Sequence, residues 1–172
     1  MLPKHSRGCE IGVWKGDFTE RLLKLAKPSE LYLIDPWKYF GEYKRAWFGG
    51  VDNTQEKMDE VYEFVLQRFQ KPIAYEQLKI IREVSSEAHQ RLEDASFDWI
   101  YIDGNHTYDF VMQDLKYYYP KLKAGGILCG DDYGTIGWWQ GGVKKAVDEF
   151  AISQKDIKQF RIFGDQFLIQ KA

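Results

Sequence analysis

Two acidic residues and two glycines near the start of the chain could together hold a nucleoside. Glu10 lies in the apolar run 9–13, and Gly12 and Gly16 follow it before a helical pattern begins. Glycines at a strand-to-helix turn let the backbone approach a ligand closely, and the amides of the helix N-terminus face that ligand. Asp35 ends the next apolar run, where a carboxylate can accept hydrogen bonds from both hydroxyls of a ribose. These four residues predict a nucleoside-binding site.

Three aspartates are candidate ligands of a divalent cation. Asp103 ends one apolar run, and Asp131 and Asp132 follow Gly130 at the end of the next. If these strands are neighbours, their ends lie roughly 5 Å apart, and oxygen ligands shared between them favour Mg²⁺, Mn²⁺ or Ca²⁺ over zinc. Consecutive strand residues point to opposite faces, so Asp131 and Asp132 can bind together only where the chain has left the sheet. The alternative is that Asp103 and Asp132 cap local turns.

His106 stands three residues after Asp103, in the sequence Asp-Gly-Asn-His. An imidazole with an unperturbed pKa near ~6.5 can take up a proton at neutral pH. His106 is therefore the candidate general base, with Asp103 as its catalytic partner, and the alternative is an ordinary loop histidine. We assign no chemistry to the other two histidines, His5 and His89.

The elements that must position these residues follow a βαβ pattern, in which short apolar runs alternate with helical periodicity. The pattern predicts strands at 9–13, 31–35, 78–84, 97–103, 127–130, 157–163 and 166–170. Helices are expected between them, the first opened by a capping box formed by Asp17 and Glu20. Gly164 and Asp165 separate the last two strands and predict a hairpin. The expected fold is α/β: a mostly parallel seven-stranded sheet with a C-terminal antiparallel hairpin and helices on both faces.

An aromatic-rich insertion at about 36–77 interrupts this pattern. It is far longer than an ordinary connection and contains a predicted helix at 54–69, and long insertions at such places are usually functional. Aromatic residues make up 16% of the chain, and most of its tryptophans follow the carboxyl end of a predicted strand. That edge is where open α/β sheets bind ligands, so a ring-lined mouth is expected there. The candidate substrate contacts are Trp37, Tyr108, Tyr133 and Trp138.

The chain resembles the class I S-adenosylmethionine-dependent methyltransferases. The resemblance rests on Glu10-x-Gly12-x-x-x-Gly16 with Asp35, the segment FDWIYIDGNHTY at 97–108, LKAGG at 122–126 and GDDY at 130–133. It is most similar to the metal-dependent O-methyltransferase branch that includes macrocin-type sugar methyltransferases and cephalosporin hydroxylase-like proteins. The similarity runs from Cys9 to the C-terminus, apart from the insertion after Asp35. It implies a single Rossmann-like methyltransferase domain over residues 1–172.

The resemblance also implies a cofactor, S-adenosylmethionine, and a role for each matching residue. Glu10 and the turn from Gly12 to Gly16 would hold its methionine end, Asp35 its ribose, and Ser85 and Ser86 its adenine, with Asp103 beside both cofactor and metal. In macrocin-type enzymes a histidine at the spacing of His106 is the base. The implied reaction transfers the sulfonium methyl to a substrate hydroxyl, whose pKa is lowered by a cation that chelates two adjacent oxygens. The expected acceptor is a small molecule, either a sugar or glycoside or a catechol-like phenol.

Composition limits the partners and the location of the protein. The chain has 172 residues with 24 basic and 26 acidic side chains and no long run of either sign, which argues against a nucleic-acid or anionic-membrane partner. No apolar stretch approaches the ~20 residues of a membrane-spanning helix. Cys9 and Cys129 lie in apolar runs, and no signal-peptide pattern opens the chain, so a cytoplasmic protein with reduced cysteines is expected. A homo-oligomer is left open, because the aromatic insertion could form a dimer contact.

Two other functions remain open on the sequence. A nicotinamide-dependent oxidoreductase would use a related fold, but the terminal hairpin and the missing GxGxxG motif count against it. A degenerate methyltransferase fold could serve as a binding protein. Against that alternative stands the complete set of candidate residues: Glu10, Asp35, Asp103, His106, Asp131 and Asp132.

Overall fold

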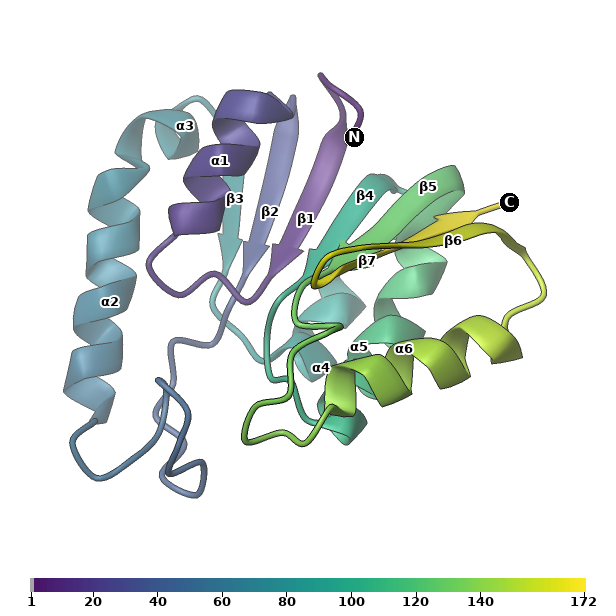
Figure 1. The fold of residues 1–172 in the computed structure, drawn as a ribbon. Helices are drawn as coiled ribbons and strands as arrows, with labels where there is room; N and C mark the ends of the chain where they lie inside the picture. Colours follow the sequence, from purple (N-terminus) through teal and green to yellow (C-terminus); the bar gives the residue numbers. More distant parts are fainter. Residues whose placement is uncertain (1) are drawn as a thin grey trace.

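The computed structural model describes residues 2–172 as a seven-stranded sheet flanked by helices (Figure 1). The strands are β1 (Arg7–Ile11), β2 (Glu30–Ile34), β3 (Leu78–Ile81), β4 (Phe97–Ile102), β5 (Leu122–Gly130), β6 (Ile157–Phe163) and β7 (Gln166–Lys171). The helices are α1 (Asp17–Leu25), α2 (Gln55–Arg68), α3 (Gln70–Ala74), α4 (Ser85–Ala88), α5 (Tyr108–Tyr118) and α6 (Gly142–Ser153), with 3₁₀ turns at His89–Arg91 and Tyr119–Lys121. Among these residues, no helix is long and apolar enough to cross a bilayer.

The strand order is β3-β2-β1-β4-β5-β7-β6. Strands β1 to β5 pair in parallel, whereas β7 is antiparallel to both β5 and β6. This confirms the predicted mostly parallel sheet with a terminal hairpin. The order reverses between β1 and β4, so the connections that leave these two strands diverge at the carboxyl edge and create the crevice in which such sheets bind ligands.

Helices cover both faces of the sheet, and each face has its own apolar core (Figure 1). On one face Cys9 and Ile11 of β1 pack with α5 and α6; on the other, Leu31 and Leu33 of β2 pack with α1 and α2. Because strand residues alternate in direction, Glu10 lies on the α1 face, between two residues that serve the opposite core. One polar residue of β1 is thereby buried inside the sheet.

Several strand boundaries differ from the sequence prediction, among them the end of β3, which lies at Ile81 rather than residue 84, and two of the differences have a physical reason. Strand β1 ends at Ile11 rather than Val13, because the amides of Val13 and Trp14 bind the carboxylate of Asp35 instead of a neighbouring strand. Strand β5 begins at Leu122 rather than at residue 127, so it includes Gly125 and Gly126. The β4–β5 pairing contains a register shift between Phe97 and Trp99, which allows β5 to start earlier than the residue spacing predicts.

The predicted capping box at α1 is wrong, whereas the predicted start of α2 is confirmed. The N-cap of α1 is Gly16 in a left-handed conformation, with no side-chain cap. The carboxylates of Asp17 and Glu20 instead bind Arg68 of α2, at 2.7 and 2.6 Å. At α2, the hydroxyl of Thr54 accepts a hydrogen bond from an amide of the first turn. The acidic pair therefore ties the first helix to the insertion.

The insertion turns back over the carboxyl edge of the sheet. Its first part is irregular, with Trp37 only 1% exposed in the core, and α2 and α3 follow. The ring of Tyr43 lies 6.2 Å from that of Phe110 on α5 and 5.9 Å from that of Trp138, between β5 and α6. The insertion thus joins the β2 side of the crevice to the β5 side through aromatic contacts.

The turn after β1 touches the end of β4 through backbone atoms alone. Gly12 has a φ of +85°, and a Cβ at this position would lie 2.1 Å from the carbonyl oxygen of Asp103. The amide of Asp103 in turn donates to the carbonyl of Ile11 at 2.7 Å. Only glycine allows this approach, and it brings the β1 turn directly beside the candidate catalytic loop.

We expect Gly12→Ala to destabilise the protein more than Gly125→Ala, as measured by urea unfolding. Gly125 has a similar φ of +76°, but a Cβ there meets nothing within 4 Å. Both variants should lose about 1–2 kcal/mol through the left-handed backbone. Gly12→Ala should lose a further ~1 kcal/mol or more through overpacking against Asp103. Equal losses of unfolding free energy in the two variants would show that the backbone around residue 12 and Asp103 can relax to make room for a Cβ.

Candidate active site

Asp35 fixes the turn that follows β1. Its Oδ2 accepts hydrogen bonds from the amides of Val13 and Trp14 at 2.8 and 3.0 Å, and its Oδ1 accepts one from the amide of Trp37 at 2.8 Å. Burial raises the pKa of Asp35, while these backbone donors act in the opposite direction. The predicted ribose ligand is therefore also a structural residue, a role that motif spacing does not indicate.

Glu10 is a buried acid with an unused oxygen. The side chain is 1% exposed; Oε2 accepts a 2.6 Å hydrogen bond from the Thr19 hydroxyl, and Oε1 has no partner among residues 2–172. Burial, with smaller contributions from the charges of Asp103 and Asp35, raises the pKa of Glu10 to about 8. The group is thus protonated at neutral pH unless a cation joins it.

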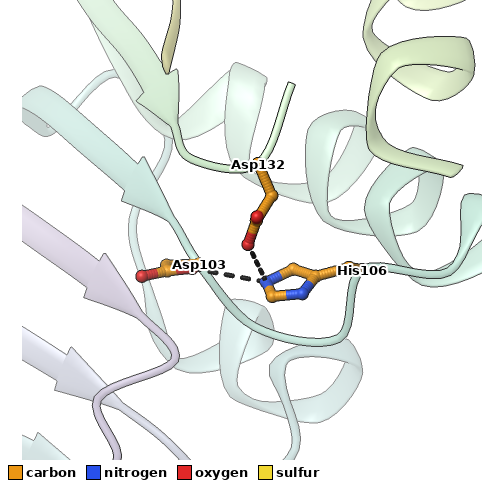
Figure 2. A group of neighbouring side chains, drawn as sticks. All are labelled: Asp103, His106 and Asp132. Atoms are coloured by element: carbon orange, nitrogen blue, oxygen red, sulfur yellow. Dashed lines mark hydrogen bonds and ion pairs between the residues drawn. The ribbon is translucent and has the colours of Figure 1, made fainter. Parts of the chain in front are cut away.

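Asp103, His106 and Asp132 form a compact group at the ends of β4 and β5 (Figure 2). Nε2 of His106 lies 3.3 Å from Oδ1 of Asp103 and 3.3 Å from Oδ2 of Asp132. One ligand atom from each of the three side chains lies within 4.8 Å of the others. Burial raises the pKa of Asp103, and the hydrogen bond with His106 acts against that rise. The spacing from Asp103 to His106 therefore did predict neighbours in space.

Asp131 stands outside that group in the part of the chain that the structure describes. Strand β5 ends at Gly130, and Asp132 has a φ of 60°, so the chain has left the sheet as the two-aspartate hypothesis requires. Oδ1 of Asp131 nevertheless accepts a hydrogen bond from the amide of Asp132 at 3.0 Å. Its role as a third metal ligand remains a prediction.

Trp139 packs against the imidazole of His106, a contact that the sequence did not predict, although Trp139 is one of the tryptophans expected at this edge. Its ring lies 4.7 Å from that of His106 in an edge-to-face arrangement, and its buried Nε1 has no hydrogen-bond partner among residues 2–172. Gly142, at the start of α6, packs against the backbone of the loop that carries His106, where a Cβ would lie 2.7 Å from the carbonyl oxygen of His106. The loop between β5 and α6 therefore supports the candidate base.

The four aromatic residues proposed as substrate contacts differ in their burial and in the hydrogen bonds that they already make. Trp37 is buried and donates through Nε1 to the carbonyl of Trp14 at 2.9 Å, so it supports the turn and offers no surface to an acceptor. The hydroxyls of Tyr108 and Tyr133 donate to the α6 side chains Glu149 and Asp148, at 2.5 and 2.6 Å. Trp138 lies half-buried beside Trp139, 5.7 Å between ring centres, and is the best placed of the four.

Ser85 and Ser86 open α4, beside a buried acid that the sequence analysis also missed. The carbonyl of Ser85 accepts a 2.9 Å hydrogen bond from the hydroxyl of Tyr118. Burial raises the pKa of Asp114 on α5 to about 7, and the side chain of Ser85 acts in the opposite direction. The sequence pattern could have revealed this acid. Asp114 lies on the same helix face as Val111, Leu115 and Tyr118, where an acidic side chain is unusual.

A family profile described as a methyltransferase domain matches residues 9–133. Among curated proteins, the chain is similar to the uncharacterized protein y4gI of Sinorhizobium fredii (strain NBRC 101917 / NGR234), with 26% identity over 104 residues. That match covers 60% of this chain and 10% of the relative, so the chain spans about a tenth of the relative's length.

Solved methyltransferase structures share the fold. The O-methyltransferase NovP superposes with a TM-score of 0.64 and 19% identity, over 97% of this chain and 72% of that one. MycE, a methyltransferase of the mycinamycin biosynthetic pathway solved in complex with Mg, SAH and mycinamycin VI, gives a TM-score of 0.58 and 15% identity, over 98% and 45%. These likenesses establish the fold of the chain.

We expect Glu10→Gln to stabilise the protein at high pH. Because the folded-state pKa of Glu10 is about 8 against an ordinary value of 4.5, the folded state holds a proton that the unfolded state releases. Stability from this group is complete below about pH 4.5 and is lost as the pH rises towards 8. Glutamine keeps the acceptor for Thr19 without the titration, so the variant should exceed wild type by about 1 kcal/mol or more at pH 9.

Urea unfolding at pH 5 and pH 9 measures this difference. Glu63→Gln, an exposed acid on α2, is the matched control and should leave the pH dependence unchanged. A Glu10→Gln variant whose stability follows wild type at both pH values would contradict the buried, proton-holding state of Glu10.

Proposed function

The chain belongs to the family of methyltransferase domains, and from this premise we propose that it is an S-adenosylmethionine-dependent O-methyltransferase assisted by a divalent metal ion. We further propose that residues 1–172 act as one domain and that the acceptor is a hydroxyl of a small molecule: a sugar, a glycoside or a catechol-like phenol. The observation that carries the proposal is the group of Asp103, His106 and Asp132 beside the turn that follows β1.

The residues around the β1 turn fit the cofactor. Oε1 of Glu10 is a buried acceptor without a donor, and the α-ammonium group of the methionine end would supply one. A Cβ at Gly12 would fill the space beside Asp103. Oδ1 of Asp35 accepts one hydrogen bond and has capacity for a second, which a ribose hydroxyl can donate. Likeness to MycE, whose solved complex contains SAH, supports the same choice.

The donor set around His106 fits a hard divalent cation. Asp103 and Asp132 present carboxylate oxygens from neighbouring strands, and both side chains remain partly exposed, at 32% and 24%. Such oxygens suit Mg²⁺, Mn²⁺ or Ca²⁺. We propose Mg²⁺ as the natural ion, with Asp131 as the third carboxylate, and the Mg in the MycE complex supports this.

The proposed mechanism divides the work between the bound groups and the chain. When bound, the cofactor supplies an electrophilic methyl, and the ion lowers the pKa of the acceptor hydroxyl. His106 accepts the hydroxyl proton, and Trp139, packed against its ring, keeps the imidazole at the edge of β4 and β5. Trp138 and the aromatic residues of the insertion exclude water and orient a flat or sugar-like acceptor.

Mn²⁺ binding, followed by electron paramagnetic resonance, tests the metal site without an acceptor. Asp103→Asn and Asp132→Asn should each weaken Mn²⁺ by about 10-fold or more, since each removes a charged ligand. Asp131→Asn should do the same if three carboxylates bind the ion. Asp109→Asn, an exposed acid at the start of α5, should have no effect. Wild-type binding that survives both Asp103→Asn and Asp132→Asn would remove the metal from the proposal.

Methyl transfer tests the activity directly. Protein, radiolabelled S-adenosylmethionine and Mg²⁺ are incubated with nucleotide sugars, glycosides and catechols, and labelled product is counted with and without chelator. We expect one class to be methylated, and His106→Gln to lower the rate by about 100-fold or more, because general-base catalysis contributes roughly that much. Calorimetry that detected NADH binding but no S-adenosylmethionine binding would instead favour the oxidoreductase alternative.

A further inference from the structure

A cavity of about 530 Å³ lies between the turn after β1 and the insertion. Its lining comes from that turn, from the irregular part of the insertion and from α2, and includes Trp14, Lys15, Trp47, Asn53, Lys57 and Phe64. The volume is within the range of small-molecule sites, about 300–1,000 Å³. None of the lining residues belongs to the group of candidate base and metal ligands, so the proposed mechanism gives this cavity no role.

Two indole rings line the cavity from opposite segments of the chain. The ring centre of Trp47 lies 5.9 Å from that of Trp14, and the two planes are inclined at 44° rather than stacked. The side chain of Trp47 is 74% exposed, so it contributes little to the apolar core. An indole that is left open in this way offers a broad, flat surface to another ring. The pair is therefore suited to a planar ligand.

Both rings are placed by contacts that the protein makes itself. The amide of Trp14 donates to Oδ2 of Asp35 at 3.0 Å, and Trp14 has a φ of 52°, a left-handed conformation that bulky residues rarely adopt. The carbonyl of Trp47 accepts a hydrogen bond from Nδ2 of Asn53, just before α2. Backbone strain of this kind is typical of segments that bind ligands. The walls of the cavity are thus positioned in advance, which lowers the entropic cost of binding.

The charged groups of the lining favour an anion. Two are basic, Lys15 and Lys57, and one is acidic, Glu60. Nζ of Lys15 lies 5.9 Å from the ring centre of Trp14, and Nζ of Lys57 donates to the carbonyl of Asp52, so both ammonium groups stay near the indoles. Within residues 2–172, neither ammonium group forms an ion pair with a carboxylate. Lysine ammonium groups are common ligands of phosphate.

We propose that this cavity binds a ligand in which a flat ring carries a phosphate group. The ring packs against the indoles of Trp14 and Trp47, and the ammonium groups of Lys15 and Lys57 neutralise the phosphate. A ring alone would leave both lysines without a counter-charge, and a phosphate alone would leave the indoles exposed. The site goes beyond the proposed function, because it involves neither the cofactor, nor the metal ion, nor the transferred methyl.

A nuclear magnetic resonance titration with phenyl phosphate tests the site, because the six tryptophans give separate indole N–H signals. Spectra of Trp14→Phe and Trp47→Phe identify the two signals of interest. In wild type we expect both to shift to saturation, with a Kd of about 1 mM or tighter. Inorganic phosphate and benzyl alcohol each carry only one half of the proposed chemistry, and should bind about 10-fold more weakly.

Single substitutions separate the two contributions. Trp47→Ala, read from the Trp14 signal, should weaken phenyl phosphate by about 10-fold, since stacking of one ring contributes about that much. Lys15→Gln and Lys57→Gln should each weaken it by about 3-fold and reduce the salt dependence of binding. Tyr75→Ala and Lys116→Gln, an exposed ring and an exposed lysine outside the cavity lining, are the matched controls and should bind as wild type does.

Saturable shifts of the two signals that need both ring and phosphate, and that weaken in the three cavity variants, support the proposal. It is wrong if neither signal shifts up to about 10 mM phenyl phosphate, or if other tryptophans respond instead. Equal affinity for inorganic phosphate or for benzyl alcohol also overturns it, as does unchanged affinity in Trp47→Ala or in both lysine variants. Since no cofactor is added, a negative result leaves the proposed methyl transfer untouched.

Discussion

The carboxylate of Asp35 is the constraint on which the site depends. One side chain accepts three backbone amides, two from the turn after β1 and one from the start of the insertion. An unsatisfied buried amide costs about 1–3 kcal/mol, so removing this acceptor would release two segments at once. The turn it fixes is the one that places Gly12 against Asp103. The turn after β1 and the end of β4 are therefore held in register by one acid.

The fold tolerates buried acids that its own contacts do not satisfy. Glu10 and Asp114 each have an oxygen without a donor, and burial raises the pKa values of both. A core selected for stability alone would replace them with apolar side chains, because burying a polar group without its full set of hydrogen bonds is costly. Both acids lie beside the point where the strand order reverses. A ligand bound there can supply the hydrogen bonds that the two acids lack. These positions on β1 and α5 thus face the apolar core but carry side chains suited to binding a ligand.

The sequence predicted the sheet and the convergence of Asp103, His106 and Asp132, because parallel strands bring their carboxyl ends to one edge. It failed where a partner is distant in the chain. Asp17 and Glu20 satisfy the local capping rule, yet Arg68 on α2 binds both. Trp37 was predicted to contact the substrate, yet its ring is in the core and donates to the carbonyl of Trp14. Local spacing contains no information about such partners; only the packed insertion supplies them.

The two nitrogens of His106 allow it to be both positioned and reactive. Nε2 points between the carboxylates of Asp103 and Asp132, as Figure 2 shows, and it donates to them when it carries the ring proton. A neutral imidazole that donates through Nε2 has its lone pair on Nδ1. In the proposed mechanism, the proton of the acceptor hydroxyl would then pass to Nδ1 of His106. An ion held by the same carboxylate oxygens, as we propose, would compete with Nε2 of His106 for them, because the ligand atoms of Asp103, His106 and Asp132 lie within 4.8 Å of one another.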